Sequence, residues 1–324
     1  MNILLTGATG FVGRAVAVRL ATLGCRVLCL VRDASRAAWM QDYPGLESVG
    51  GDLQDLSTIV PHLGDAELVV HLAGLTKGRN GKEYYRVNGR GTANLLDAIR
   101  AAGKNVRKIL YVSSLAVAGP HTSDHPATED GEVAPLTDYG ASKLVGERYL
   151  RAGCDNIPWT ILRPPAVYGP YDRDLFLFFK MAKFGVIPVL GNGAMELSLI
   201  HVVDLAAALT LAAFTNISDR QIYYLSDGRT YTIAEMAKTL AGVAGGRVVS
   251  IPLAAGRLAG LCGDLMARFG RARVINSQKI REANQPGWVC DTTKIAAQLG
   301  FRPTIGLADG FAATYRWYMT AGWL

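Results

Sequence analysis

Tyr139 and Lys143 are the residues whose types and spacing best suit catalysis in this 324-residue sequence. They lie four positions apart at the expected start of a helix, where positions i and i+4 share one face. A lysine ammonium favours a nearby phenolate, so we expect the tyrosine pKa to fall toward neutrality and its oxygen to exchange a proton with a substrate oxygen. An ordinary amphipathic helix could carry the same pair, so the elements around it must decide.

A glycine-rich turn near the N-terminus predicts a dinucleotide site. The apolar strand 2–6 is followed directly by Gly-Ala-Thr-Gly-Phe-Val-Gly and then by a helix. Glycines allow a tight bend and a close backbone approach to a pyrophosphate, which the N-terminal amides of the helix would face. The residues expected to contact the cofactor here are Gly7, Thr9, Gly10, Phe11 and Val12.

The end of the second strand, residues 26–31, bears on which cofactor binds. An acidic residue at this place would accept hydrogen bonds from the ribose hydroxyls of NAD. Here Val31 is followed by Arg32, with Arg36 close behind, and two arginines suit the 2′-phosphate of NADP. We therefore expect NADP(H), while Asp33 keeps NAD(H) open.

Strands and helices alternate through the first half of the chain. Strands 68–74 and 106–114 follow the first three strands, with helical segments between them. This alternation predicts an α/β fold built on a Rossmann-type, doubly wound parallel sheet. The residues expected to line the cofactor at the carboxyl ends of these strands are Asp52, Leu53, Ala73 and Gly74.

The composition is that of a globular protein: 50% of the residues are hydrophobic and 19% are charged. The net charge of +7 fits an anionic ligand, but the basic residues are spread without interleaved aromatics, so we expect no nucleic-acid partner. The five scattered cysteines and five histidines predict neither a disulfide framework nor a metal site. No apolar run reaches ~20 residues, and a strand at residue 2 leaves no room for a signal peptide, so we expect a cytoplasmic protein.

Five segments, in chain order, carry a resemblance to a known family. They are residues 6–13, 71–74, 87–92, 113–114 and 139–143. Together they resemble the extended short-chain dehydrogenase/reductases of the NAD-dependent epimerase/dehydratase superfamily. The pattern is most similar to the branch of 3β-hydroxysteroid dehydrogenases and dihydroflavonol reductases.

The resemblance implies a role for each matching residue. Tyr139 would be the general acid/base, Lys143 would hold the nicotinamide ribose and lower the tyrosine pKa, and Ser114 would hydrogen-bond the reacting oxygen. Asn88 would support the site. The other residues implied near the cofactor are Ser113, Pro164 and Val167. Family resemblance also suggests a homodimer.

We divide the chain into two interleaved parts. Residues 1–165 and about 200–226 would form the NAD(P)-binding Rossmann domain. Residues from about 166 to 199 and from 227 to 324 would form a smaller, mostly helical substrate lobe.

Several features favour an apolar substrate. Leu115 and Ala116 stand where sugar dehydratases of this family carry an Asp-Glu pair, and Leu197 stands where nucleotide-sugar epimerases commonly carry an arginine for the pyrophosphate. The apolar run 175–181 could line a lipophilic pocket or fill a core. The basic segment 251–281 could touch a membrane or cap the substrate, and a helix with a solvated cationic face would look the same.

These patterns predict an NAD(P)-dependent oxidoreductase that interconverts a secondary alcohol and a ketone on a small or lipid-like substrate. One alternative is a nucleotide-sugar 4-epimerase with tightly bound NAD. A second is a non-catalytic NAD(P)-binding assembly or sensor protein, and the intact Ser114, Tyr139 and Lys143 speak against it.

Overall fold

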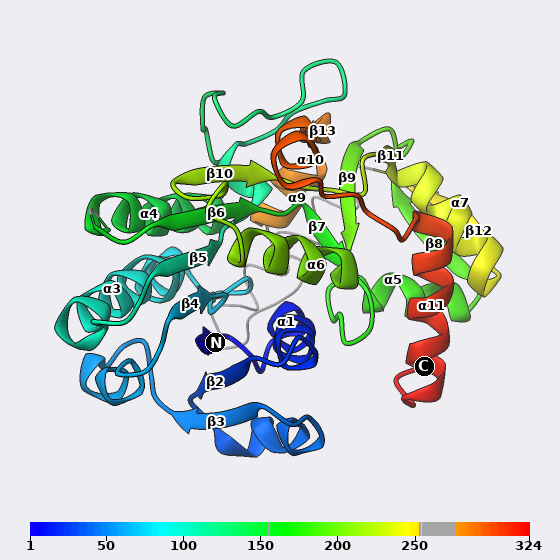
Figure 1. Ribbon diagram of the computed structural model, residues 1–324. Helices are drawn as coiled ribbons and strands as arrows, with labels where there is room; N and C mark the ends of the chain where they lie inside the picture. Colours follow the sequence, from blue (N-terminus) through cyan, green and yellow to red (C-terminus); the bar gives the residue numbers. More distant parts are fainter. Residues whose placement is uncertain (155, 253, 255–276) are drawn as a thin grey trace.

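A parallel sheet forms the centre of the fold (Figure 1). The computed structural model describes residues 1–154, 156–252, 254 and 277–324. Within these residues the sheet has seven strands in the order β10-β6-β5-β4-β1-β2-β3, and each neighbouring pair is parallel. The strands are β1 (Asn2–Thr6), β2 (Arg26–Val31), β3 (Leu46–Gly50), β4 (Leu68–His71), β5 (Lys108–Val112), β6 (Trp159–Arg163) and β10 (Gln221–Tyr224). The predicted Rossmann-type α/β fold is confirmed.

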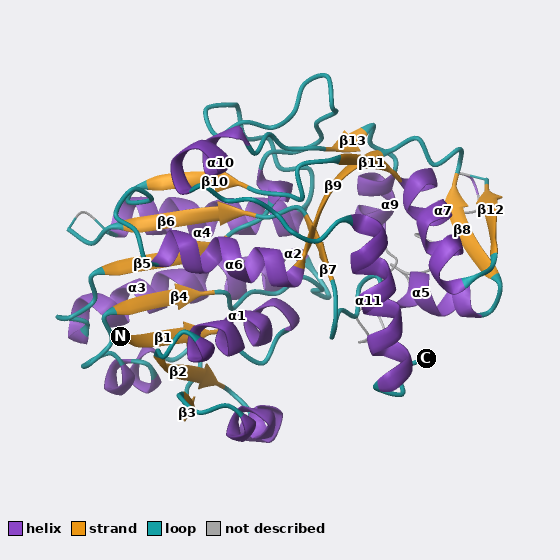
Figure 2. Ribbon diagram, turned by 45° about the vertical axis from the view of Figure 1, so that its right-hand side comes forward, coloured by secondary structure: helices purple, strands orange, loops and turns teal. Residues whose placement is uncertain are grey.

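Helices cover both faces of the sheet because its strands are apolar on both faces. In β1, Ile3 and Leu5 face a core shared with α1 and α6, while Leu4 faces the opposite core, shared with α3 (Figure 2). The helices are α1 (Phe11–Thr22), α2 (Gly81–Tyr84), α3 (Gly91–Ala102), α4 (Asp138–Gly153) and α6 (Val202–Ala213). Shorter helical turns are η1 (Ala34–Asp42), η2 (Leu56–Thr58), η3 (Val60–His62), η4 (Tyr85–Arg90) and η5 (Leu115–Val117).

The second lobe, on the right in Figure 1, packs helices against small sheets. Its described elements are β7 (Ala166–Tyr168), α5 (Phe176–Lys183), β8 (Val186–Leu190), β9 (Glu196–His201), β11 (Thr230–Thr232), α7 (Ile233–Ala244), β12 (Arg247–Ile251), α9 (Ser277–Ala283), β13 (Gly287–Trp288) and α11 (Leu307–Thr320). The buried Phe179 ring lies 5.2 Å from Phe311 and 5.3 Å from Tyr318, centroid to centroid. The apolar run 175–181 thus contributes to the core of this lobe.

The chain returns from this lobe to the large sheet. Helix α6 packs on α1, and β10 extends the large sheet beyond β6 as its edge strand. Helix α10 (Thr293–Leu299) places Ile295 in the core that also holds Tyr223. Most of the basic segment 251–281 lies outside the described residues. Among the helices that the structure describes, none is long and apolar enough to cross a bilayer.

Candidate active site

The predicted site residues lie where the strands of the large sheet end. The strand order reverses between β1 and β4, and in an open parallel sheet this reversal leaves a crevice in which ligands bind. The glycine turn follows β1, Ala73 follows β4, Ser114 follows β5 and Pro164 follows β6. Residues far apart in sequence therefore meet along one edge.

The glycine turn brings β1, β4 and α1 into contact. Gly7 has a φ of +83°, and a Cβ there would lie 2.6 Å from the Ala73 amide nitrogen. A Cβ on Gly13 would lie 2.0 Å from the Gly7 carbonyl oxygen, so α1 packs directly on the turn. No side chain caps the first amides of α1. This backbone fits a dinucleotide pyrophosphate. Thr9, Gly10, Phe11 and Val12 lie between these glycines.

Arg32 and Arg36 are both exposed in the segment that follows β2. The intervening Asp33 caps η1, because its carboxylate accepts hydrogen bonds from the Ser35 amide at 3.0 Å and the Ser35 hydroxyl at 2.7 Å. These bonds lower the pKa of Asp33. Both bonds go to Oδ1 of Asp33, and Arg32 and Arg36 are the cationic side chains of this segment.

The residues predicted after β3 and β4 differ in what they contact. The Asp52 carboxylate accepts the Gln54 amide at 3.0 Å, so it stabilises its own turn, and Leu53 is buried in the core beside α3. Gly74 lies next to Lys143: a Cβ on Gly74 would be 3.6 Å from the Lys143 ammonium nitrogen.

Ser114 and Tyr139 are brought together by a close approach of two elements. Ser114 precedes η5, and its Oγ accepts the Ala116 amide at 3.2 Å. Thr137 caps α4, whose second residue is Tyr139. A Cβ on Gly140 would lie only 2.4 Å from the Ala116 carbonyl oxygen, so glycine allows α4 to approach η5. The Ser114 side chain lies close enough to the half-buried Tyr139 phenol to lower the pKa of Tyr139.

The expected fall in the pKa of Tyr139 is wrong for the protein alone. Burial raises the pKa of Tyr139 to about 12, and the hydrogen bond from Ser114 opposes this only in part. Burial also lowers the pKa of Lys143 to about 7, against the opposing charge of Glu147. The reason is that both groups lie in a poorly solvated site, where desolvation disfavours both charged forms.

Lys143 lies next to a buried ion-pair network that the sequence did not reveal. Its Nζ is 4.2 Å from the centre of the Tyr111 ring. One helical turn further on, Glu147 forms a two-pronged ion pair with Arg163, at 2.9 and 2.6 Å. Arg163 also donates to the Tyr224 hydroxyl at 2.8 Å. The spacing of four residues between Lys143 and Glu147 places both on one face of the helix and could be seen in the sequence. The pairing of Glu147 with Arg163 on β6 depends on the fold and could not.

Asn88 connects the loop after β4 with α4. Its side chain accepts the Leu75 amide at 2.7 Å and donates to the Leu75 carbonyl at 3.1 Å and to Ser142 Oγ at 2.9 Å. Ser142 in turn donates to the Tyr139 carbonyl at 2.7 Å. Asn88 therefore fixes the backbone on either side of the crevice, as a supporting residue would.

The remaining predicted cofactor residues flank Ser114. The buried Pro164 accepts the Leu115 amide through its carbonyl at 2.8 Å, and Val167 lies half-buried on β7. The Ser113 hydroxyl is buried and has no hydrogen-bond partner among the described residues. A buried hydroxyl without a partner is costly, so a polar ligand group at this edge would fit it.

His71 should make the stability of the folded protein depend on pH. Its ring lies between Thr6 Oγ1 at 2.7 Å and Thr92 Oγ1 at 3.0 Å, and burial, with the charge of Lys143, lowers its pKa to about 3. Between pH 3 and the ordinary value of 6.5 the unfolded chain binds a proton that the folded protein does not, so stability should rise with pH across this window. Urea unfolding across the window should show a slope that His71→Gln reduces by up to about 1.4 kcal/mol per pH unit. Parallel curves for the two proteins would show that folding does not lower the pKa of His71.

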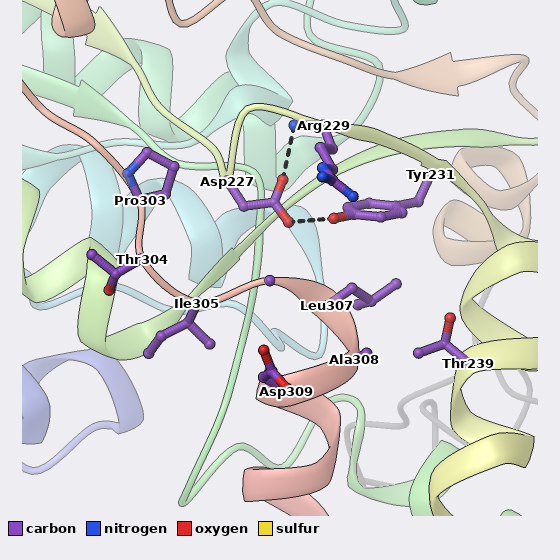
Figure 3. Close-up of a pocket in the computed structure, with 11 residues that line it drawn as sticks. Asp227, Arg229, Tyr231, Thr239, Pro303, Thr304, Ile305, Leu307, Ala308 and Asp309 are labelled. Atoms are coloured by element: carbon purple, nitrogen blue, oxygen red, sulfur yellow. Dashed lines mark hydrogen bonds between the residues drawn. The ribbon is translucent and has the colours of Figure 1, made fainter.

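A separate cavity of about 560 Å³ lies in the second lobe, between β11, α7 and the start of α11 (Figure 3). Tyr231 donates to the Asp227 carboxylate at 2.8 Å at its rim. Neither Ser114 nor Tyr139 lines this cavity, so it is distinct from the crevice at the sheet edge.

Known proteins resemble this chain over its whole length. The ceramide reductase of Caulobacter vibrioides is 35% identical, with 99% of this chain and 96% of the relative covered. The UDP-glucose 4-epimerase of Vibrio cholerae is 27% identical, with coverage of 99% and 96%. The solved structure of DesIV, a dTDP-glucose 4,6-dehydratase from Streptomyces venezuelae with NAD and TYD bound, is 25% identical, with a TM-score of 0.81 and coverage of 100% and 98%. The sequence model of one family matches residues 3–226. The chain therefore belongs to the NAD dependent epimerase/dehydratase family.

Proposed function

We propose that the protein is an NADP(H)-dependent reductase that converts a ketone on a lipid-like substrate into a secondary alcohol. The observation that carries this proposal is the close approach of α4 to η5 at Gly140, which brings Tyr139 beside Ser114 at the sheet edge, with the Lys143 ammonium beside Gly74. Two hydroxyls at one place can both reach a single carbonyl oxygen, which is the arrangement that ketone reduction needs.

Each residue has a defined task in this reaction. The nicotinamide, when bound, supplies the hydride to the carbonyl carbon. Tyr139, whose raised pKa keeps it a neutral phenol, donates its proton to the carbonyl oxygen as that oxygen gains charge. Ser114 hydrogen-bonds the same oxygen and orients it. Lys143, whose pKa of about 7 allows either charge state, stabilises the phenolate that remains.

The lipid-like class rests on what replaces the sugar-binding chemistry. Leu115 and Ala116 follow Ser114, so no carboxylate pair is available there for sugar dehydration. Leu197, on β9, packs against the core of the second lobe. The 35% identical relative is named a ceramide reductase, which supports a ceramide-class lipid that carries a ketone.

The purified protein should oxidise NADPH when a ketone-bearing ceramide-class lipid is supplied in detergent micelles, with one alcohol formed per NADPH. UDP-galactose and UDP-glucose are the comparison substrates. Conversion of one sugar nucleotide into the other without added cofactor would support the 4-epimerase alternative, which the Vibrio cholerae relative favours, and would refute the reductase.

Cofactor preference depends on Arg32 in this proposal. Arg32→Ala should weaken NADPH binding by about 10-fold or more and leave NADH binding nearly unchanged, because only NADPH carries the 2′-phosphate. Fluorescence titration with each cofactor gives both affinities. Arg151→Ala, an exposed arginine in the last turn of α4, is the control for a lost surface charge. An equal loss for both cofactors would mean that Arg32 does not contact that phosphate.

A further inference from the structure

Arg14, on the first turns of α1, has its guanidinium against two aromatic rings. The guanidinium carbon lies 4.1 Å from the centre of the Trp39 ring and 4.2 Å from the centre of the Tyr171 ring. Trp39 comes from η1 after β2, and Tyr171 comes from the loop between β7 and α5. Tyr171 is in turn held by Trp317 of α11, with ring centroids 4.3 Å apart.

The backbone of Tyr171 adds to the evidence that this stack is a built feature. Its φ is +72°, a conformation that non-glycine residues rarely adopt and that persists only where surrounding contacts compensate for it. The contacts that compensate here are the ring contacts with Arg14 and Trp317.

Cation–π contacts hold the guanidinium beside the two rings but do not use its five N–H donors, which lie in the guanidinium plane. Among the described residues, none accepts a hydrogen bond from Arg14 or forms an ion pair with it. The protein thus holds a planar, half-buried, five-donor cation in a defined orientation without an acceptor.

The position of Arg14 indicates what the acceptor is. Side chains on a helix lean toward its N-terminus, so Arg14 leans toward the glycine turn. Its partner Trp39 belongs to the same η1 segment as Arg36 and follows Arg32 by seven residues. Arg14 is thus linked through Trp39 to the η1 segment, which contains Arg36 and follows Arg32, at the edge of the sheet where the dinucleotide is proposed to bind.

We propose that Arg14 is a phosphate ligand of the bound dinucleotide, with Trp39 and Tyr171 setting its orientation. This inference rests on the proposed cofactor use. The phosphate is either the 2′-phosphate, next to Arg32 and Arg36, or the pyrophosphate over the glycine turn. Both are dianionic or polyanionic oxygen groups that an edge-on guanidinium binds with two parallel hydrogen bonds.

The cofactor affinities of the Arg14→Met variant test this proposal directly, because methionine keeps an apolar side chain beside the rings and removes the N–H donors of the guanidinium. We expect about a 10-fold or larger loss of NADPH affinity by fluorescence titration or calorimetry, the scale of a lost charge-assisted contact. A loss for NADPH alone assigns Arg14 to the 2′-phosphate, and an equal loss for NADH assigns it to the pyrophosphate. Unchanged affinity for both cofactors would overturn the proposal.

Matched variants separate binding from folding. Arg19→Met removes the same charge from α1 at a residue bonded to Thr210 and should leave both affinities unchanged. Tyr171→Leu removes one ring and should weaken binding less than Arg14→Met does, while Tyr171→Phe keeps the ring and should bind as the unmodified protein does. If Arg14→Met does not fold, Arg14→Lys, with the charge but not the planar fork, must still bind NADPH more weakly. Failure of the unmodified protein to bind any dinucleotide would instead refute the proposed function.

Discussion

Replacing Tyr139 by phenylalanine should lower the rate of ketone reduction by about 100-fold or more, the usual scale for a lost general acid. The substitution removes only the phenol oxygen beside Ser114, and the ring and the start of α4 remain. Stopped-flow measurement of NADPH oxidation gives the chemical step, and fluorescence titration gives cofactor affinity. Affinity should change little, because the phenol acts on the substrate oxygen.

Tyr84→Phe is the matched control for this experiment. Tyr84 is a buried tyrosine whose ring centroid is 6.2 Å from that of Tyr139, and its hydroxyl donates to the Thr76 carbonyl at 3.3 Å. Its loss should leave turnover near that of the unmodified protein. If both variants reduce the ketone at the unmodified rate, Tyr139 is not the proton donor.

Replacing Arg163 by methionine should have the largest effect on stability. The side chains of Arg163 and Glu147 are only 3% and 2% exposed, and the change leaves a carboxylate buried without its cation. Breaking a buried pair in this way costs about 3–5 kcal/mol of unfolding free energy. Urea unfolding monitored by tryptophan fluorescence measures the loss.

Two comparisons test the cause of this loss. The pair Arg26–Glu47 has the same two-pronged geometry, but its side chains are 50% and 46% exposed, so Arg26→Met should destabilise the protein far less than Arg163→Met does. In the double variant Glu147→Gln with Arg163→Met, the buried charge is gone and part of the stability should return. A double variant as unstable as Arg163→Met would mean that packing, and not the uncompensated charge, dominates.

Local sequence patterns were sufficient for the elements that begin the fold. The strand predicted at 2–6 and the strand at 26–31 match β1 and β2, since continuous apolar runs and glycine turns are local signals. The turn from Gly7 to Gly13 also has the close packing that its spacing predicts. The Ser114–Tyr139 contact followed from resemblance, and Gly140 supplies its physical basis.

Other features depend on the tertiary environment. The direction of the pKa change at Tyr139 was predicted wrongly, because the spacing to Lys143 shows a nearby charge but not the burial that outweighs it. The Arg163 partner of Glu147 and the ring partners of Arg14 come from segments distant in sequence, so no local pattern reveals them.

Transfer of deuterium from NADPH that carries deuterium at both C4 positions of the nicotinamide tests the central claim most directly. The account predicts that the unmodified protein places one deuterium on the new carbinol carbon of a ketone-bearing ceramide-class lipid, as mass spectrometry would show. It also predicts that the Tyr139→Phe variant, loaded with the same cofactor, forms that product more slowly by about 100-fold or more. An alcohol product without the label, or equal labelling rates in both proteins, would contradict it.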